Sequence, residues 1–266
     1  MRGARWAAVA LSCGLLPAAA AENPAAPPPA YIAVVIDDLG YSLREGARVL
    51  KLPGPVACAI LPHTLYGARL AERAQALGKE VILHLPLEAP ADHEAGPGQI
   101  DTAMPARELA ATLAYDLASI PHAAGVSSHM GSVFTQREPA VRALMQAIKA
   151  RGGLFFIDSL TSADSVAARI AAESGVPYLV RDVFLDSERT STAIAQRLQE
   201  IERRARTRGT ALAIGHPYPE TLEALERWLP GLAARHIQLV PLSVMLKRRS
   251  PEEAHGDRTR SAGPGL

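Results

Sequence analysis

The sequence predicts an α/β domain built on a mainly parallel β-sheet, either open or closed into a barrel. Eight short apolar runs alternate with segments whose apolar residues recur at three- and four-residue steps, as at Leu109, Leu113 and Leu117. The runs are apolar throughout, which indicates strands that are buried on both faces. Repeated units of this kind favour parallel strands joined by helical crossovers.

The elements follow one another in a regular order. The predicted strands are 31–36, 56–61, 80–85, 125–127, 154–157, 178–185, 210–214 and 237–240. The predicted helices are 42–50, 66–77, 106–119, 139–151, 162–174, 190–208 and 219–235. Residues 86–105 have no strand or helix pattern and contain several Pro and Gly, and a loop of this length in a compact domain is often functional.

The two ends of the chain differ in composition from the body. Arg2 and Arg5 precede the apolar stretch 6–16 and the small residues Ala19 to Ala21, which predicts a signal peptide over 1–21. A Pro/Ala-rich linker is predicted over 22–30, the folded domain over 31–246 and a disordered tail over 247–266. The apolar stretch is shorter than the roughly 20 residues of a membrane span, so we expect a periplasmic or otherwise secreted protein with no span after cleavage.

The charge balance argues against one class of partner. The chain has 28 basic and 27 acidic residues and a net charge of +1, which gives no electrostatic basis for binding nucleic acid. Aromatic residues make up only 5% of the sequence, which also argues against stacked-base recognition.

Polar side chains follow most of the predicted strands. Because ligand sites of parallel α/β folds lie at the carboxyl ends of the strands, these residues are the candidates for a site. They are Asp37, Asp38, His84, Glu88, His129, Asp158, Asp186 and His216. Two adjacent buried carboxylates are costly without a compensating positive charge, although the Asp pair alone could equally be a helix cap with a solvated neighbour. Together with three histidines at the same edge, the pair favours a metal site, most simply for Zn²⁺.

At these residues the chain resembles the divergent polysaccharide deacetylase family, a branch of the polysaccharide deacetylase superfamily. The resemblance covers about residues 31–245. It rests on six stretches at 34–40, 84–88, 129–132, 155–159, 181–186 and 214–217, which read VVIDDLG, HLPLE, HMGS, FFIDS, RDVFLD and IGHP. It implies a distorted (β/α) barrel of about seven mainly parallel strands.

The resemblance also implies roles for individual residues. Asp37 is expected to act as general base, Asp38 to bind the metal and His216 to act as general acid. His84 matches the first histidine of the superfamily's metal motif, but Glu88 stands where the second would be. His129 is then the expected third ligand, with Glu88 as the competing ligand or as a hydrogen-bond acceptor for a ligating imidazole.

Four more residues are candidates for the surroundings of the site. Arg181 could orient Asp37, while Asp158, Asp182 and Asp186 would either line the sugar cleft or anchor loops. The implied activity is the hydrolytic removal of N- or O-acetyl groups from an envelope glycan, with Zn²⁺ as the cofactor. Two alternatives stay open: a non-catalytic glycan-binding module that keeps the fold and the metal, and a purely structural metal site.

Overall fold

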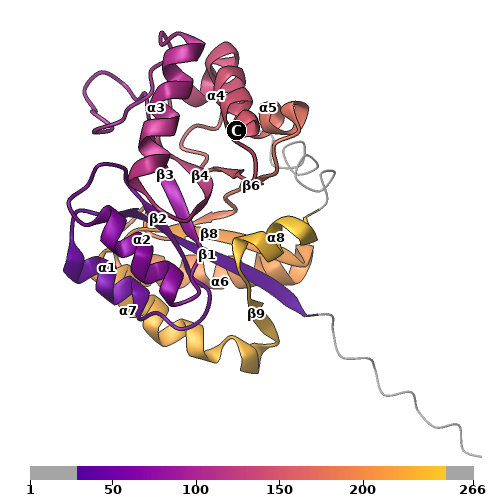
Figure 1. The fold of residues 1–266 in the computed structure, drawn as a ribbon. Coiled ribbons are helices and arrows are strands. Elements are labelled where there is room, and N and C mark those ends of the chain that lie inside the picture. The colour runs from indigo at the N-terminus through magenta and orange to yellow at the C-terminus, as the bar shows by residue number, and fades with distance from the viewer. Residues whose placement is uncertain (1–28, 250–266) are drawn as a thin grey trace, which may run out of the picture.

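A computed structural model describes residues 29–249 (Figure 1). The predicted signal peptide, most of the predicted linker and residues 250–266 of the predicted tail lie outside the described residues. The folded body is slightly longer than predicted at both ends. The first strand begins at Ala30, and the last helix continues to Arg248, two residues into the predicted tail.

The described residues form one curled sheet of nine strands, and its neighbouring strands pair in parallel. The strand order is β6-β5-β4-β3-β2-β1-β8-β7, and β9 also pairs with β1. The strands are β1 (Ala30–Leu39), β2 (Ala57–Ile60), β3 (Val81–Leu87), β4 (Ala123–Met130), β5 (Phe155–Asp158), β6 (Tyr178–Val180), β7 (Val183–Phe184), β8 (Thr210–Gly215) and β9 (Ile237–Leu239). The parallel sheet is confirmed. The number of strands exceeds the expected seven or so because β6, β7 and β9 are short, separate strands.

A single run of sequence forms both edges of the sheet. The predicted strand 178–185 divides into β6 at one edge and β7 at the other, with only Arg181 and Asp182 between them. The Arg181 amide donates to the Asp158 carbonyl at the end of β5, and the Asp182 amide donates to the Leu212 carbonyl of β8. This crossing therefore joins the two edges of the curled sheet into a nearly closed barrel.

Eight α-helices and three 3₁₀ turns surround the sheet in the described part of the chain. The helices are α1 (Leu43–Leu50), α2 (Gly67–Ala76), α3 (Ala106–Ser119), α4 (Glu138–Arg151), α5 (Ala167–Ser174), α6 (Ser191–Arg208), α7 (Pro219–Trp228) and α8 (Leu242–Arg248). The turns η1 (Phe134–Gln136), η2 (Leu229–Gly231) and η3 (Ala233–Arg235) complete the set, and the last two occupy the second half of the predicted helix 219–235. Figure 1 shows α1, α2 and α7 on one side of the sheet and α3, α4 and α5 on another.

The strands separate two hydrophobic cores by simple alternation. Ile32 and Val34 of β1 join the large cluster between the sheet and the outer helices, whereas Ala33 and Val35 join a smaller cluster inside the curl. The inner positions of β1 and β2 include several alanines, which leave a narrow interior that side chains fill completely. Asp37 is the next residue in the inner series, at the point where the inner core ends.

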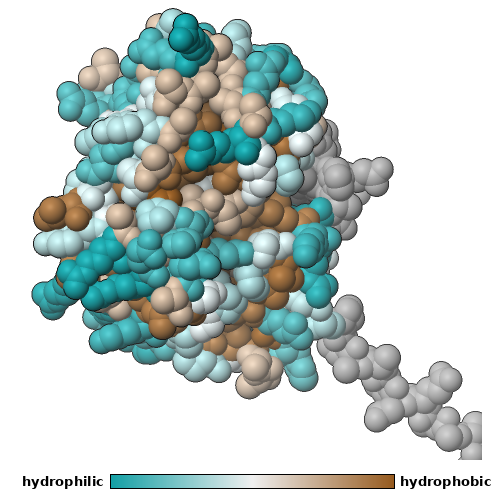
Figure 2. All heavy atoms as spheres, in the orientation of Figure 1, coloured by the Kyte–Doolittle hydropathy of each residue, from teal (hydrophilic) through white to brown (hydrophobic). Residues whose placement is uncertain are grey.

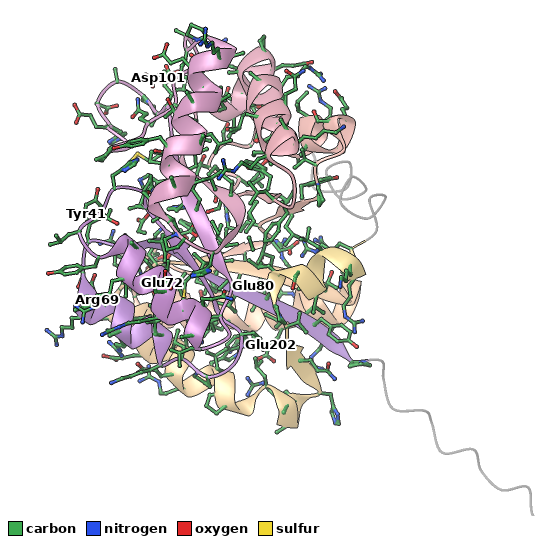
Figure 3. The ribbon with its side chains drawn as sticks, in the orientation of Figure 1. Tyr41, Arg69, Glu72, Glu80, Asp101 and Glu202 are labelled. Carbon is green, nitrogen blue, oxygen red and sulfur yellow. The ribbon has the colours of Figure 1, made fainter. Side chains whose placement is uncertain are left out.

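Helix α8 packs into the inner core rather than on the outside of the sheet. Its buried Leu242 and Met245 belong to the inner cluster. Its first turn is held by Glu80, just before β3, whose carboxylate accepts hydrogen bonds from the amides of Leu242 (2.6 Å) and Ser243 (3.1 Å) (Figure 3). Because Glu80 and β9 lie at the amino ends of the strands, α8 plugs the barrel at the end opposite Asp37.

The outer helices carry the polar surface. Figure 2 shows hydrophilic residues spread over them, with hydrophobic residues between. Among residues 29–249, no helix combines the length and the hydropathy needed to cross a bilayer.

Candidate metal centre

A break in the first strand brings two consecutive carboxylates to the same point. Successive side chains of a strand point to opposite faces, so Asp37 and Asp38 would normally diverge. The pairing of β1 with β2 shifts register between Ile36 and Leu39, and Asp38 has φ +57°, a left-handed conformation that Asp tolerates better than most residues. As a result, Asp37 Oδ2 and Asp38 Oδ1 both approach His84 Nε2, at 3.6 Å and 3.2 Å.

His84 is buried on β3 and has a defined orientation. Its Nδ1 lies 2.8 Å from the Ser127 hydroxyl of β4, which is its direct neighbour in the strand register. If Nδ1 carries the proton of this hydrogen bond, Nε2 keeps its lone pair and faces the two carboxylates. A hydrogen bond on the far nitrogen is the usual way in which proteins orient a metal-binding imidazole.

His129 lies at the end of β4 and completes a triad of donors. Its Nδ1 is 2.9 Å from Asp38 Oδ1, and its ring meets that of His84 edge to face, with the centroids 4.8 Å apart. Asp38, His84 and His129 each offer one ligand atom, and these atoms lie within 4.8 Å of one another.

Two buried carboxylate oxygens without a hydrogen-bond partner indicate whether this triad fits a cation. Asp37 Oδ1 and Asp38 Oδ1 are buried and have no hydrogen-bond partner among the described residues, although two imidazole nitrogens lie close to Asp38 Oδ1. Buried polar atoms without partners are rare in folded proteins and usually mark a missing ion or water. One carboxylate oxygen and two imidazole nitrogens also match the ligand preferences of Zn²⁺. The donor set therefore fits a divalent metal.

The two carboxylates differ in their electrostatic environment. Burial raises the pKa of Asp37 above its ordinary value, and the nearby histidines only partly oppose the shift. Burial acts in the same direction on Asp38, but its close contacts with His129 and His84 outweigh it and hold the Asp38 pKa well below the usual range. The environment therefore favours the ionised form of Asp38 and disfavours that of Asp37.

His216 approaches the same centre from the end of β8. Its Nε2 is 3.7 Å from Asp38 Oδ2, and its Nδ1 is 2.9 Å from Asp186 Oδ1. Asp186 is fully buried, and its other oxygen accepts hydrogen bonds from the His216 amide (2.6 Å) and the Thr221 hydroxyl (2.8 Å). Burial alone would lower the pKa of His216, but the hydrogen bond to Asp186 and the charges of Asp38 and Asp37 raise it overall.

Three of the other predicted residues anchor loops or strands. Glu88 accepts a 2.6 Å hydrogen bond from the Thr102 amide and so ties down the long loop after β3, and the triad of donor atoms does not include it. Asp158 accepts hydrogen bonds from the Leu160 amide and the Ser165 hydroxyl. Asp182 accepts a hydrogen bond from the Leu212 amide at 2.6 Å and pairs with Arg249.

Arg181 bridges two parts of the barrel mouth. Its guanidinium donates to the carbonyls of Ser159 (2.6 Å) and Leu160 (2.9 Å) and lies over the ring of Phe184. Burial lowers its pKa, and Asp37 is among the carboxylates whose charges oppose that shift. The hydrogen bonds of its guanidinium go to main-chain carbonyls, so the predicted orientation of Asp37 by Arg181 has no direct contact behind it among the described residues.

Three residues of the site were not singled out from the sequence. Ser127 orients His84, Thr221 supports Asp186, and Tyr218 stacks at a tilt against His216 with the ring centroids 5.5 Å apart. The register of adjacent parallel strands could have identified Ser127, because it lies two residues before His129 and beside His84. Tyr218 directly precedes α7 and Thr221 lies in its first turn. Their contacts depend on how the start of this helix lies beside Asp186 and His216, which the helical periodicity does not reveal.

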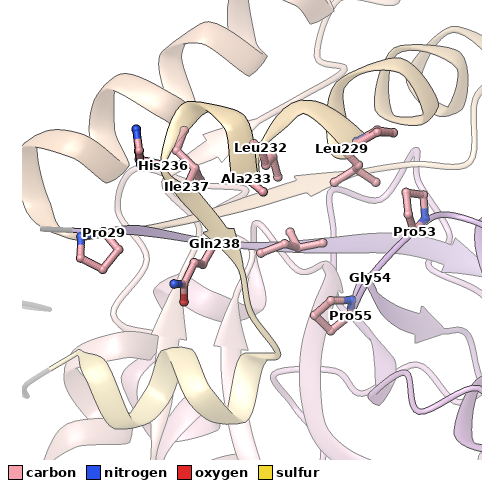
Figure 4. A pocket seen from close by; sticks show the side chains of 12 residues that line it. Pro29, Pro53, Gly54, Pro55, Leu229, Leu232, Ala233, His236, Ile237 and Gln238 are labelled. Carbon is pink, nitrogen blue, oxygen red and sulfur yellow. The ribbon is translucent and has the colours of Figure 1, made fainter. Parts of the chain in front are cut away.

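A separate apolar hollow lies at the other end of the barrel. Its lining includes Pro29, which precedes β1, Pro55, which precedes β2, and Ile237 of β9 (Figure 4). These positions are at the amino ends of the strands. The hollow is therefore distinct from the carboxyl edge that holds the histidines and carboxylates.

Comparisons with known proteins agree with this architecture. Residues 34–246 match the model of a family described as divergent polysaccharide deacetylase. The chain is 32% identical over 215 residues to the uncharacterized protein YibQ of Escherichia coli, which covers 81% of this chain and 67% of that protein.

Two solved structures have a similar fold. A crystal structure of an uncharacterized protein from Agrobacterium tumefaciens matches with a TM-score of 0.78 and 28% identity, over 82% of this chain and 89% of that one. The peptidoglycan deacetylase PdaC of Bacillus subtilis matches with a TM-score of 0.51 and 15% identity, over 84% of this chain and 92% of that one. At that identity the second match speaks for the fold alone, and it confirms the predicted (β/α) barrel type.

Proposed function

Because the chain belongs to the divergent polysaccharide deacetylase family, we propose that it is a metal-dependent hydrolase that removes acetyl groups from an envelope glycan. The observation that carries the proposal is the convergence of five groups at one barrel mouth. They are Asp37, Asp38, His84, His129 and His216. A carboxylate base, a triad of metal donors and a protonated imidazole are the groups that amide or ester hydrolysis requires.

The triad of Asp38, His84 and His129 would hold the metal, most simply Zn²⁺. When bound, such an ion lowers the pKa of a coordinated water toward about 7 and polarises the acetyl carbonyl. Only three protein ligands are present in the triad, which is the arrangement of catalytic rather than structural zinc sites.

Asp37 would act as the general base. Its carboxylate is buried, one of its oxygens has no hydrogen-bond partner in the described part of the chain, and its pKa is raised above the ordinary value by burial. A carboxylate with a raised pKa is a better proton acceptor near neutral pH. Asp37 would take a proton from the attacking water as the oxygen of that water bonds to the acetyl carbon.

His216 would act as the general acid. Asp186 holds Nδ1 and raises the pKa of the imidazole, which keeps His216 protonated at higher pH and leaves Nε2 directed toward the centre. The proton on Nε2 would pass to the sugar nitrogen or oxygen as its bond to the acetyl carbon breaks. The products are acetate and a free amine or hydroxyl on the glycan.

The proposed substrate agrees with the predicted route of the protein. A signal peptide over residues 1–21 would deliver the chain to the periplasm or beyond, where envelope glycans are found.

Two departures from the superfamily support a second candidate, a glycan-binding module without turnover. Glu88 stands where the wider superfamily has its second histidine, and His129 stands where it has an arginine-bearing motif. The Glu88 carboxylate is bound to the Thr102 amide. A purely structural metal site is the third alternative, and both make predictions that differ from those of a hydrolase.

Acetate release measures the proposed activity directly. Purified residues 22–266 with Zn²⁺ would be assayed on acetylated chito-oligosaccharides and on peptidoglycan fragments. Asp37→Asn should lower kcat/KM by about 10²- to 10⁴-fold without loss of metal, because general bases contribute on that order. Asp92→Asn, which changes a side chain that is 77% exposed, is the matched control and should retain full activity. Equal rates in the parent and Asp37→Asn would remove Asp37 from the mechanism.

Elemental analysis tests the ligands and separates the alternatives. His129→Ala should lose most of the bound metal, whereas full retention would move the third ligand to Glu88. Glycan binding without acetate release under any metal would favour the binding module. Unfolding on removal of the metal, with no glycan binding, would favour a structural site.

A further inference from the structure

We propose that Arg189, held against Tyr218 beside His216, forms a subsite for a carboxylate and that the protein acts on acetylated glycans that carry one. This inference rests on the proposed function, since it takes the ligand to be a glycan bound at the barrel mouth. It adds a property that the metal and the acid–base groups do not determine, which is the charge of the preferred substrate.

The position of Arg189 is fixed by an aromatic ring. Arg189 lies between β7 and α6, and its guanidinium carbon is 3.6 Å from the centroid of the Tyr218 ring. Its Nη2 also donates a hydrogen bond to the Tyr218 hydroxyl. A cation–π contact and a hydrogen bond together limit the freedom of an otherwise exposed side chain.

Tyr218 connects this cation to the proposed acid. Its ring centroid is 5.5 Å from that of His216. Burial raises the pKa of the Tyr218 hydroxyl, and the charge of Asp38 acts in the same direction. On another side of His216, Phe184 makes an edge-to-face contact at 5.2 Å. His216 thus lies beside two aromatic rings, and each ring also carries an arginine: Arg181 lies over Phe184 and Arg189 lies over Tyr218. Arg189 is therefore one side chain farther from the centre than Tyr218.

The charge of Arg189 is available to a ligand. Two partly exposed arginines, Arg48 and Arg142, are each neutralised by a glutamate at 2.7 Å. Within residues 29–249, the two contacts that hold the exposed Arg189 are both with Tyr218, and neither involves a carboxylate. A guanidinium held by a ring keeps N–H groups free, and its planar fork matches a carboxylate in a two-point hydrogen bond.

The charges around the centre also favour this place for an anion. Asp37, Asp38 and Asp186 surround the reacting position, so a carboxylate there would be repelled. A substituent that reaches Arg189 avoids them. Two sugars bring this chemistry to acetylated glycans, the lactyl ether of a muramic acid and the C6 carboxylate of a hexosaminuronic acid.

Binding measurements test the subsite separately from turnover. The Zn²⁺-loaded protein carrying Asp37→Asn, which should not consume substrate, would be titrated calorimetrically with two acetylated disaccharides, one of each type. Each would be compared with its carboxyl-reduced counterpart. The carboxylated form should bind about tenfold more tightly, the low end for a charged hydrogen bond at an exposed site. The pair that shows the larger ratio identifies the source of the carboxylate.

Variants assign the preference to Arg189. Arg189→Gln should bring the ratio close to one, and Tyr218→Leu should reduce it because the guanidinium loses its support. Arg227→Gln is the matched control: Arg227 is an exposed arginine of α7, paired with Glu223, and its variant should keep the full ratio. High salt should weaken only the carboxylated ligands.

Several results would overturn the subsite. They are a ratio near one in the parent for both disaccharides, no measurable binding of either, and an unchanged ratio in Arg189→Gln. By contrast, a preserved ratio in a protein with intact Asp37 that releases no acetate would refute the hydrolase and leave the subsite standing.

Discussion

Replacement of Asp186 by Asn isolates the contact that makes His216 an acid. The carboxylate is fully buried, one oxygen meets His216 Nδ1 at 2.9 Å, and the other accepts two hydrogen bonds. Asn keeps the size of the side chain and removes its charge. The imidazolium would then lose the main attractive contact that raises its pKa.

The size of the effect follows from the geometry. A hydrogen bond to a charged group contributes about 1.5–3 kcal/mol, and one pKa unit corresponds to about 1.4 kcal/mol. Since Asn can still accept a weaker hydrogen bond, we expect the pKa of His216 to fall toward its ordinary value without losing the whole of this contribution. The Asn NH₂ group would also replace Oδ2, which now accepts hydrogen bonds from the His216 amide and the Thr221 hydroxyl. These donors would lose their acceptor, which should lower the free energy of unfolding by about 1–3 kcal/mol.

The pH profile of kcat/KM is the direct assay. The acid must be protonated, so activity is lost as pH rises through the pKa of His216. The basic limb of the Asp186→Asn profile should therefore lie at lower pH than that of the parent. The linked effect on stability has the same sign. A raised imidazole pKa stabilises the fold fully below about pH 6.5, and this contribution disappears as pH rises through the folded pKa. The difference in unfolding free energy between parent and variant should therefore shrink with increasing pH.

Thr221→Val provides the control. It removes one of the donors to Asp186 but keeps the carboxylate and its contact with His216. The Thr221→Val variant should be less stable than the parent, but the basic limb of its kcat/KM profile should lie at the same pH. If Asp186→Asn lost stability but its basic limb did not move, Asp186 would not set the pKa of the group that acts as the acid.

Two further predictions concern the support of the centre and the plug of the barrel. Ser127→Ala removes the hydrogen bond that orients His84 and should weaken Zn²⁺ binding about 10- to 100-fold, measured by competition with a chromophoric chelator. Ser243→Ala, which changes an exposed serine, is the control and should bind Zn²⁺ like the parent. Equal affinities in the two variants would show that His84 needs no such support. Met245→Ala empties part of the inner core and should lower the free energy of unfolding, measured in urea, by about 2–5 kcal/mol. The affinity for Zn²⁺ should stay unchanged, because α8 lies at the opposite end of the barrel. A loss of binding free energy for Zn²⁺ as large as the loss of unfolding free energy would show that the two ends are coupled.

The sequence predicted the convergence of the site because strand direction determines it. Asp37, His84, His129 and His216 all follow apolar runs, and parallel strands bring such positions to one edge. What it did not contain was the bulge at Asp38. That bulge depends on one backbone angle, and it decides whether the second carboxylate joins the site or points away.

The same reasoning could not separate four similar acidic residues. Asp158, Asp182, Asp186 and Glu88 all lie near strand ends, and Asp186 holds His216 of the proposed mechanism. The hydrogen bonds described for the other three go to main-chain amides or a hydroxyl of loops and strands. The difference arises from loops that fold back over the strands, and these contacts leave no periodic pattern in the sequence. The sequence also could not distinguish the inner face of each strand from its outer face, because both faces are apolar.

The crossing at Arg181 and Asp182 sets the aperture of the barrel. Two residues span at most a few steps of about 3.8 Å between Cα atoms, so the wall that carries Ser159 and the wall that carries His216 are kept at a fixed separation. A longer crossing would let these walls move apart without changing any residue that binds metal or transfers a proton. The length of this short segment, rather than the chemistry of the centre, is therefore where we expect the fold to adjust to the width of a bound ligand.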